Sequence, residues 1–148
     1  LISNSVEKTQ AIAGQLVREL LKTKKSKLQT ATVVALTGDL GAGKTTFIQG
    51  AAQALGVSEK VLSPTFLIMR RFEVAKEHKP FQALHHIDWY RILEPKEALD
   101  LGLEEILKNA ANLVVIEWAD RFPKLVPKSA VQVKLEWLGD EKRRISVA

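Results

Sequence analysis

The residues best suited to chemistry form a glycine-rich segment that ends in a lysine and a threonine, Gly38-Asp-Leu-Gly-Ala-Gly-Lys-Thr45. This segment matches the phosphate-binding pattern G-x-x-x-x-G-K-[ST] at every fixed position. Glycine tolerates backbone angles that a β-carbon forbids, so successive amide groups of such a loop can point at one anion. We therefore expect phosphate groups to bind along residues 39–46, which are Asp39, Leu40, Gly41, Ala42, Gly43, Lys44, Thr45 and Thr46.

Lys44 and Thr45 add two reactive side chains to this loop. In loops of this kind the lysine reaches the β- and γ-oxygens of a nucleoside triphosphate, and the hydroxyl holds Mg²⁺. The pattern arises by chance in under about 1% of chains of this length, given average residue frequencies. The alternative is a plain glycine-rich turn with an exposed lysine. The pattern favours a nucleotide site in which the charge of Lys44 stabilises the transition state.

A phosphate-binding loop needs acidic partners, and Glu117 is the first candidate. It follows the aliphatic run 113–116 and should emerge at the carboxyl end of a buried strand, beside the loop. A carboxylate placed there can bind Mg²⁺ directly or through water. Asp120 is the fallback, and an ordinary ion pair between Glu117 and Arg121 is the alternative.

Asp88 is the second candidate acid, in the segment His86-Ile-Asp-Trp-Tyr-Arg91. Alternation along an extended strand places His86, Asp88 and Tyr90 on one face. Asp88 can assist the metal or the attacking water, or it can be a salt-bridged surface acid, and the residue types alone leave both open. Two ligands at the spacing of His86 and Asp88 are too few for a zinc site.

The segment Ser63-Pro-Thr-Phe66 interrupts helical patterning and reads as a loop. Loops of nucleotide-dependent switches become ordered when they contact the γ-phosphate, and a hydroxyl in this segment could make that contact. A proline turn with a helix-capping serine is the equally weighted alternative.

The elements that must position these residues are a strand before the loop and a helix after it. Hydrophobic periodicity, β-branched runs and turn residues predict helices at about 5–22, 44–55 and 94–108, the last interrupted at Gly102. The same signals predict strands at 32–37, 66–74, 81–88 and 113–116, and a terminal hairpin of 131–137 and 144–147 that turns at Gly139-Asp140. Strand–helix units followed by hairpins imply a mixed sheet with helices packed on it.

Composition narrows the class of protein. The chain has 148 residues, of which 46% are hydrophobic and 26% charged, as in one compact globular domain rather than a disordered or repetitive chain. It has no cysteine, which excludes disulfides and thiol catalysis and fits a cytoplasmic protein. No apolar run approaches the roughly 18 residues of a membrane span, and the first ten residues do not resemble a signal peptide.

The net charge of +5 is concentrated in part at 22–27 and 142–144. Such basic clusters can approach the phosphates of RNA. A solvated linker and a charged edge strand are the favoured interpretation of these two segments.

Several segments, in this order, resemble the bacterial TsaE family, also called YjeE, the small ATPase of tRNA threonylcarbamoyladenosine biosynthesis. The matching pieces are SVEKT at 5–9, GDLGAGKTTF at 38–47, SPTF at 63–66, HIDWYR at 86–91 and IEWADR at 116–121. The resemblance implies one α/β domain over residues 1–148, a P-loop NTPase-like three-layer sandwich. Its central sheet would be mixed and mostly parallel, with a C-terminal hairpin.

The resemblance also implies ATP and Mg²⁺ as cofactors and catalytic roles for three residues. Lys44 would contact the phosphates, Thr45 and Glu117 would hold Mg²⁺, and Asp88 would assist the metal or the attacking water. Thr9 and Trp118 would lie near the nucleotide, on the side of its base. The roles of Thr65 and Arg91 stay open.

In this family, nucleotide turnover supports the TsaB–TsaD pair, which attaches threonylcarbamoyl to the adenosine beside the anticodon, so contact with tRNA would be indirect or weak. A second hypothesis makes ATP a conformational switch that governs docking, with hydrolysis incidental. A third is a small-molecule kinase, for which the chain lacks an arginine-rich insertion between Glu94 and Ala111.

Overall fold

One seven-stranded sheet organises residues 1–23, 29–62 and 68–148, which the computed structural model describes. The strands are β1 (Ile2–Ser3), β2 (Thr32–Thr37), β3 (Met69–Glu73), β4 (Ala83–Asp88), β5 (Asn112–Glu117), β6 (Val131–Gly139) and β7 (Lys142–Val147), in the order β1-β7-β6-β2-β5-β4-β3. Strands β6, β2, β5 and β4 pair in parallel at the centre, and the pairings toward both edges are antiparallel. The sheet is mixed with a parallel centre, as expected.

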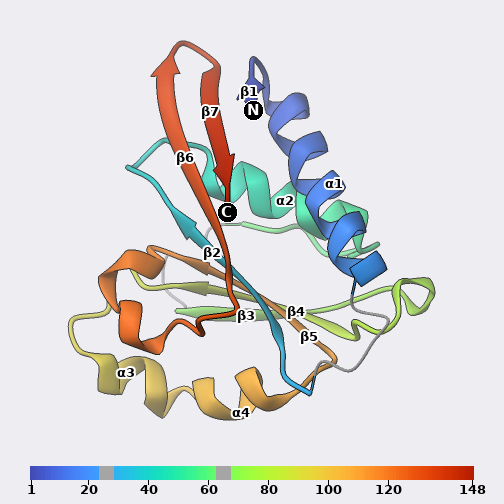
Figure 1. The fold of residues 1–148 in the computed structure, drawn as a ribbon, viewed down its shortest axis with the longest axis vertical. Coiled ribbons are helices and arrows are strands. Elements are labelled where there is room, and N and C mark those ends of the chain that lie inside the picture. The colour runs from blue at the N-terminus through green and yellow to red at the C-terminus, as the bar shows by residue number, and fades with distance from the viewer. Residues whose placement is uncertain (24–28, 63–67) are drawn as a thin grey trace.

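Helices cover both faces of this sheet, which gives three layers (Figure 1). Helices α1 (Val6–Thr23) and α2 (Lys44–Ala54) pack on one face, and α3 (Pro95–Asp100) and α4 (Leu103–Lys108) pack on the other. Ser5 caps α1 as its sequence suggests, since its Oγ accepts a hydrogen bond from the Lys8 amide at 3.1 Å. The predicted interruption at Gly102 is confirmed, because this residue has φ +84° and separates α3 from α4.

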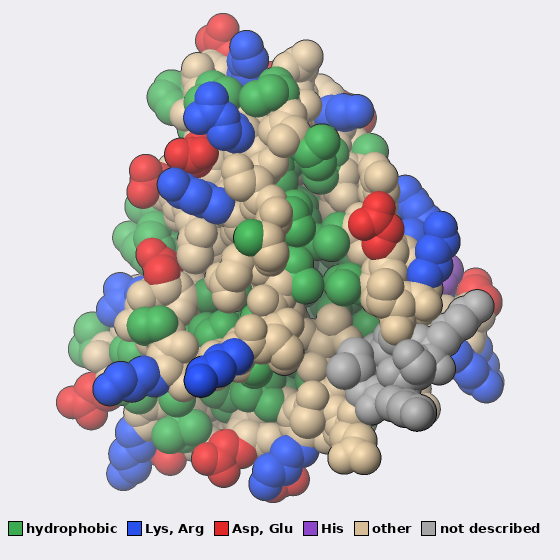
Figure 2. Space-filling model, viewed as in Figure 1, with side chains coloured by type: hydrophobic (Ala, Val, Ile, Leu, Met, Phe, Trp, Pro, Cys, Tyr) green, Lys and Arg blue, Asp and Glu red, His purple; other side chains and the backbone are tan. Residues whose placement is uncertain are grey.

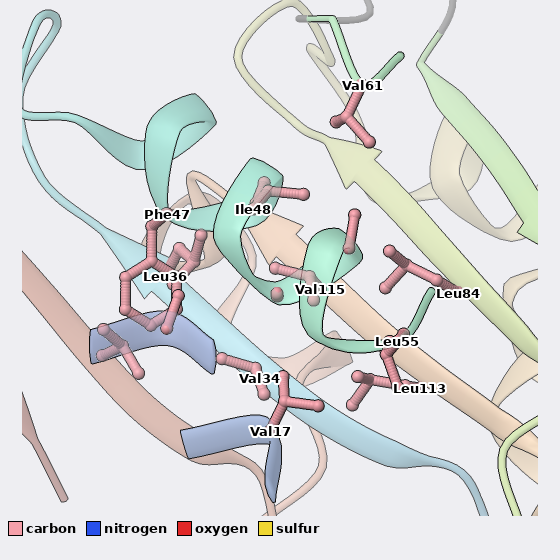
Figure 3. Packing of buried hydrophobic residues seen from close by; sticks show 14 of the residues in the cluster. Val17, Val34, Leu36, Phe47, Ile48, Leu55, Val61, Leu84, Leu113 and Val115 are labelled. Carbon is pink, nitrogen blue, oxygen red and sulfur yellow. The ribbon is translucent and has the colours of Figure 1, made fainter. Parts of the chain in front are cut away.

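The core between α2 and the sheet fixes the helix that follows the phosphate loop. Figure 3 shows Phe47 and Ile48 of α2, and Leu55 at its C-cap, packed against sheet residues that include Val115. Helix α1 crosses α2 so closely at Gly50 that a β-carbon there would lie 2.4 Å from the backbone of Gln10. Removal of apolar surface from water is the main favourable contribution to folding, so the buried face of α2 sets the position of this helix.

The opposite face is anchored by Trp89, which follows β4 directly and is fully buried. Its ring meets Phe122 edge to face, with 5.7 Å between ring centroids. Burying a side chain of this size immediately after Asp88 fixes the end of β4 and the direction of that acidic side chain.

The terminal hairpin is formed by β6 and β7, as predicted. Val133 and Leu135 are buried, whereas Trp137, on the same side of β6, is 60% exposed because it lies beyond the core, near the turn. Its indole N–H donates to the carbonyl of Asp140 at 2.8 Å. Basic and acidic side chains are interspersed on the face drawn in Figure 2 and do not form one basic patch there.

Two expectations concern segments that the structure does not describe. The 63–66 loop, with Thr65, lies outside the described residues, and so does most of the linker expected at 22–27; Lys22 and Thr23 belong to α1. Among the helices that are described, none has both the length and the apolar character needed to cross a membrane.

Candidate functional site

The phosphate loop connects β2 to α2 and adopts the backbone that its glycines predict. Gly38, Gly41 and Gly43 have φ of +147°, +79° and +100°. A β-carbon on Gly38 would lie 2.4 Å from the carbonyl oxygen of Leu135, so no other residue fits at this position. Gly43 is the N-cap of α2 and has no side chain to cap the first turn, which leaves the amides of that turn available to an anion.

Lys44 is buried within its own loop. Its Nζ donates to the carbonyl oxygens of Gly38 and Asp39 at 2.6 and 2.8 Å, and it lies 4.3 Å from the centre of the Trp118 ring. Burial lowers the pKa of the ammonium below its ordinary value of 10.5, and the carboxylate of Glu117 is the largest opposing influence. Among the described residues no carboxylate forms an ion pair with this ammonium group, so none must be displaced before it meets a phosphate.

Two acidic residues face Lys44 from adjacent strands. Asp88 ends β4, Glu117 ends β5, and the parallel register pairs the two directly. Paired residues of neighbouring strands point to the same face of a sheet, so both carboxylates project toward the phosphate loop. The residues alone predict Glu117 beside the loop, whereas they leave Asp88 open between this site and a surface ion pair.

Asp88 is half-buried, and its Oδ1 accepts a hydrogen bond from the Tyr90 amide at 2.9 Å. Burial raises the pKa of the Asp88 carboxyl, and the negative charge of Glu117 adds to that effect, while the Tyr90 amide opposes it. Within the described part of the chain no ion pair involves Asp88, which disfavours the salt-bridged surface alternative.

Glu117 pairs with a histidine and not with Arg121. Its Oε2 lies 2.6 Å from Nε2 of His86, and both side chains are almost completely buried. Arg121, the alternative partner, donates to the carbonyl oxygen of Ile92 at 2.8 Å. The simple strand-end ion pair is therefore not what the structure forms.

These residues line one pocket of about 340 Å³ at the carboxyl edge of the parallel strands. Its lining comprises Leu40, Gly41, Gly43, Lys44, Thr45, Thr46, Asp88, Tyr90, Glu117, Trp118 and Arg143. Trp118 has a left-handed backbone, with φ +58°, and its ring lies 5.0 Å from that of Tyr90. Residues other than glycine rarely adopt this conformation, and they keep it only where the surrounding structure holds the backbone in place.

Other predicted residues lie near the pocket without lining it. Ala42 is buried behind the loop. Asp39 and Asp120 line a neighbouring hollow of about 520 Å³ that shares Leu40 and Trp118 with the pocket. Thr9 faces a smaller cavity of about 90 Å³, shared with Thr46, and its hydroxyl lies 2.8 Å from that of Ser3.

Arg143 is a pocket residue in a segment expected to be a charged edge strand. That expectation is wrong, because the short strand β1 pairs with the outer side of β7. It extends from β7 to the phosphate loop, where its Nη2 donates to the Gly41 carbonyl at 3.5 Å. A β-carbon on Gly43 would lie 3.1 Å from its Cδ and Nε, so its side chain rests against the loop. Alternation in β7, which turns Arg143 and Arg144 to opposite faces, is the one sequence signal that separates it from its neighbours.

The side chains present suit a hard divalent cation. Thr45, Asp88 and Glu117 offer oxygen donors, which Mg²⁺ prefers, and Mg²⁺ is commonly held by one or two carboxylates together with phosphate oxygens and waters. Across the described ranges, no three histidine, cysteine or acidic residues form a ready-made metal cluster. The donor set therefore fits Mg²⁺ brought with a nucleotide better than a cation held by protein groups alone.

Comparison with known proteins gives consistent similarities. Residues 3–145 match the sequence family described as "Threonylcarbamoyl adenosine biosynthesis protein TsaE". Proteins named tRNA threonylcarbamoyladenosine biosynthesis protein TsaE are 39% identical over 120 residues in Nostoc sp. (79% of this chain, 69% of the relative) and 33% identical over 147 residues in Rickettsia bellii (99% and 92%). The crystal structure of Bacillus subtilis YdiB superposes with a TM-score of 0.72 at 29% identity, covering 99% of this chain and 82% of that one.

Proposed function

The chain belongs to the TsaE family of threonylcarbamoyl adenosine biosynthesis proteins, and from this premise we propose that it is a Mg²⁺-dependent ATPase that supports threonylcarbamoylation of tRNA. The observation that carries the proposal is one pocket in which a glycine-built phosphate loop, a buried lysine and two strand-end carboxylates converge.

The loop and Lys44 would bind the triphosphate. The backbone N–H groups of residues 38–46 and of the first turn of α2 would donate hydrogen bonds to its oxygens, as oriented backbone dipoles do in such loops. Lys44 would exchange the carbonyls of Gly38 and Asp39 for β- and γ-oxygens of the nucleotide. Because the ammonium is already desolvated, its charge acts in a low-dielectric site where it is worth more than in water.

The two acids would have different roles, metal binding for Glu117 and activation of water for Asp88. Thr45 and Glu117 would hold Mg²⁺, which when bound neutralises charge on the β- and γ-oxygens. Asp88 would orient a water molecule toward the γ-phosphorus and accept its proton, while the bond to the leaving ADP oxygen breaks. A carboxylate whose pKa is raised by burial is a stronger base than an exposed one, which suits this role.

Partners complete the proposal. We expect this protein to act with the TsaB–TsaD pair, as its family resemblance implies, and to meet tRNA only indirectly or weakly. Leu40 lies at the rim of the pocket and is 69% exposed. A partner protein could therefore contact the protein beside the pocket. Slow turnover of the isolated protein follows if a partner completes the site.

The test is Lys44→Ala, with Lys142→Ala as a control that removes an exposed lysine of the terminal hairpin. Calorimetric titration with Mg-ATP should give no heat for Lys44→Ala and unchanged heat for the control. Formation of threonylcarbamoyladenosine with the partner proteins should fail in the same variant. Undiminished modification by Lys44→Ala would overturn the proposal.

A nucleotide-driven docking switch is a second candidate, because the hollow that holds Asp39 and Asp120 adjoins the pocket through Trp118. Partner affinity measured with ATP, ADP and a non-hydrolysable analogue separates the two candidates. If Asp88→Ala cannot hydrolyse ATP and still supports modification, the switch is favoured. The small-molecule kinase is less favoured. The segment 94–111, where a kinase would need its lid, contains α3 and α4, which pack against the sheet with Ala98 and Leu103 buried.

A further inference from the structure

His86 is buried beside the pocket and has no role in the ATP hydrolysis proposed for this site. It lies on β4 two residues before Asp88, is fully buried, and contacts Glu117 through Nε2 at 2.6 Å. Its other ring nitrogen, Nδ1, has no hydrogen-bond partner among the described residues. An imidazole is costly to bury with one nitrogen unpaired, and an apolar side chain would fill this position without that cost.

The geometry of the two strands limits what His86 can do. Register pairs His86 with Val115 and Asp88 with Glu117, so His86 reaches Glu117 diagonally on the face that carries Lys44. One oxygen of the Glu117 carboxylate is taken by His86, while Glu117 also lines the pocket. The other oxygen, Oε1, accepts no hydrogen bond from the residues that the structure describes and is the one more open to a ligand.

We propose that His86 is a positioning residue for Glu117: its Nε2–H donates to Oε2 and fixes the carboxylate so that Oε1 faces the metal of the bound nucleotide. This inference rests on the proposed function, since it requires a Mg-nucleotide in the pocket. A carboxylate on a strand end rotates about three side-chain bonds, and a buried hydrogen bond to one oxygen removes most of that freedom. Hydrogen-bonded groups behind a metal ligand typically change metal affinity by about 10- to 100-fold when removed.

The neighbouring histidine provides a matched control. His85 precedes His86 on β4, is also buried, and also has an Nδ1 without a partner among the described residues. It points to the opposite face of the strand, where Asn112 is its hydrogen-bonding neighbour. Replacing either histidine disturbs the same strand, but only His86 touches Glu117.

The experiment compares His86→Gln with His86→Asn. A glutamine amide can place an N–H near the position of Nε2, whereas the asparagine amide is one methylene shorter and falls short of Glu117. ATP affinity is measured by calorimetry in EDTA and in excess Mg²⁺, and the ratio of the two affinities isolates the contribution of the metal. We expect His86→Asn to lower this ratio about tenfold with unchanged affinity in EDTA, and His86→Gln and His85→Asn to keep it within about twofold.

The outcomes separate the possible explanations. A wild-type ratio in His86→Asn overturns the inference, and so does an equal loss of affinity in EDTA and in Mg²⁺, since that indicates a structural role. If His86→Asn does not fold, His86→Gln decides, because a donor at the same reach must preserve the ratio. Absence of ATP binding by the wild-type protein would instead refute the proposed function, so the two failures are distinguishable.

Discussion

Replacing Arg143 with alanine is expected to weaken ATP binding by about 10- to 30-fold. Arg143 rests against the phosphate loop and donates to the Gly41 carbonyl from the terminal hairpin, so its guanidinium group lies beside the position of the phosphates. A hydrogen bond to a charged group contributes about 1.5–3 kcal/mol. Because Arg143 is only half-buried, we take the lower part of this range, and each 1.4 kcal/mol corresponds to about tenfold in affinity.

The control for this prediction is Arg144→Ala, which removes the same charge from the next residue. Arg144 lies 3.8 Å from Glu136, with half of its side chain exposed, and an exposed pair of this kind contributes about 0–1 kcal/mol to stability. Calorimetric titration with Mg-ATP at low and high salt should show a large loss only for Arg143→Ala, and the difference should narrow as salt screens the half-exposed charge. Equal effects of the two substitutions would refute the reasoning, because they would show that only net charge matters.

Two further predictions concern the fold. Asp88→Asn should raise the melting temperature of the nucleotide-free protein at pH 7. Folding raises the pKa of the Asp88 carboxyl above its ordinary value of 3.8, so keeping this group ionised destabilises the folded protein at neutral pH. Thermal melts should therefore show the difference in melting temperature between variant and wild type shrinking as the pH falls toward 3.8. A constant advantage at every pH would contradict that explanation. Gly50→Ala should lower the free energy of unfolding, measured with urea, by about 1–3 kcal/mol, because the new methyl group would lie 2.4 Å from the backbone of Gln10. A β-carbon at Gly14 would meet the flexible end of Arg18 at 3.2 Å and the Ala54 β-carbon at 3.5 Å, an ordinary van der Waals contact, so Gly14→Ala should leave the free energy of unfolding unchanged or raise it by up to about 1 kcal/mol. Equal losses for both glycines would count against the helix-contact argument.

Local signals explain how much of this molecule can be predicted from its sequence. The phosphate loop is contiguous, and its glycines encode their own backbone angles, so Gly38 and Gly43 can be placed without knowing the fold. Asp88 and Glu117 each follow a buried strand, and the carboxyl ends of neighbouring parallel strands meet at one edge. Their meeting with Lys44 also requires the strand order β2-β5-β4, which the local signals do not contain.

Long-range contacts explain what the sequence does not reveal. Arg143 is separated from Gly41 by 102 positions, and alternation places Arg143 and Arg144 on opposite faces without showing which face meets the loop. The contact between His86 and Glu117 depends on the register of two strands 31 positions apart, which periodicity alone does not fix. The exposure of Trp137 depends on where the core ends beneath a hairpin, and alternation along the strand carries no such information.

The placement of Trp118 gives this protein an optical reporter of its own. Of the three indoles, Trp89 is sealed in the core and Trp137 sits on the hairpin, while Trp118 alone lies under the ammonium of Lys44 at the pocket wall. A ligand that draws Lys44 away is expected to change the electric field across that indole and to shift its emission. Occupancy can therefore be followed in a stopped-flow fluorimeter, in real time and without attaching a dye.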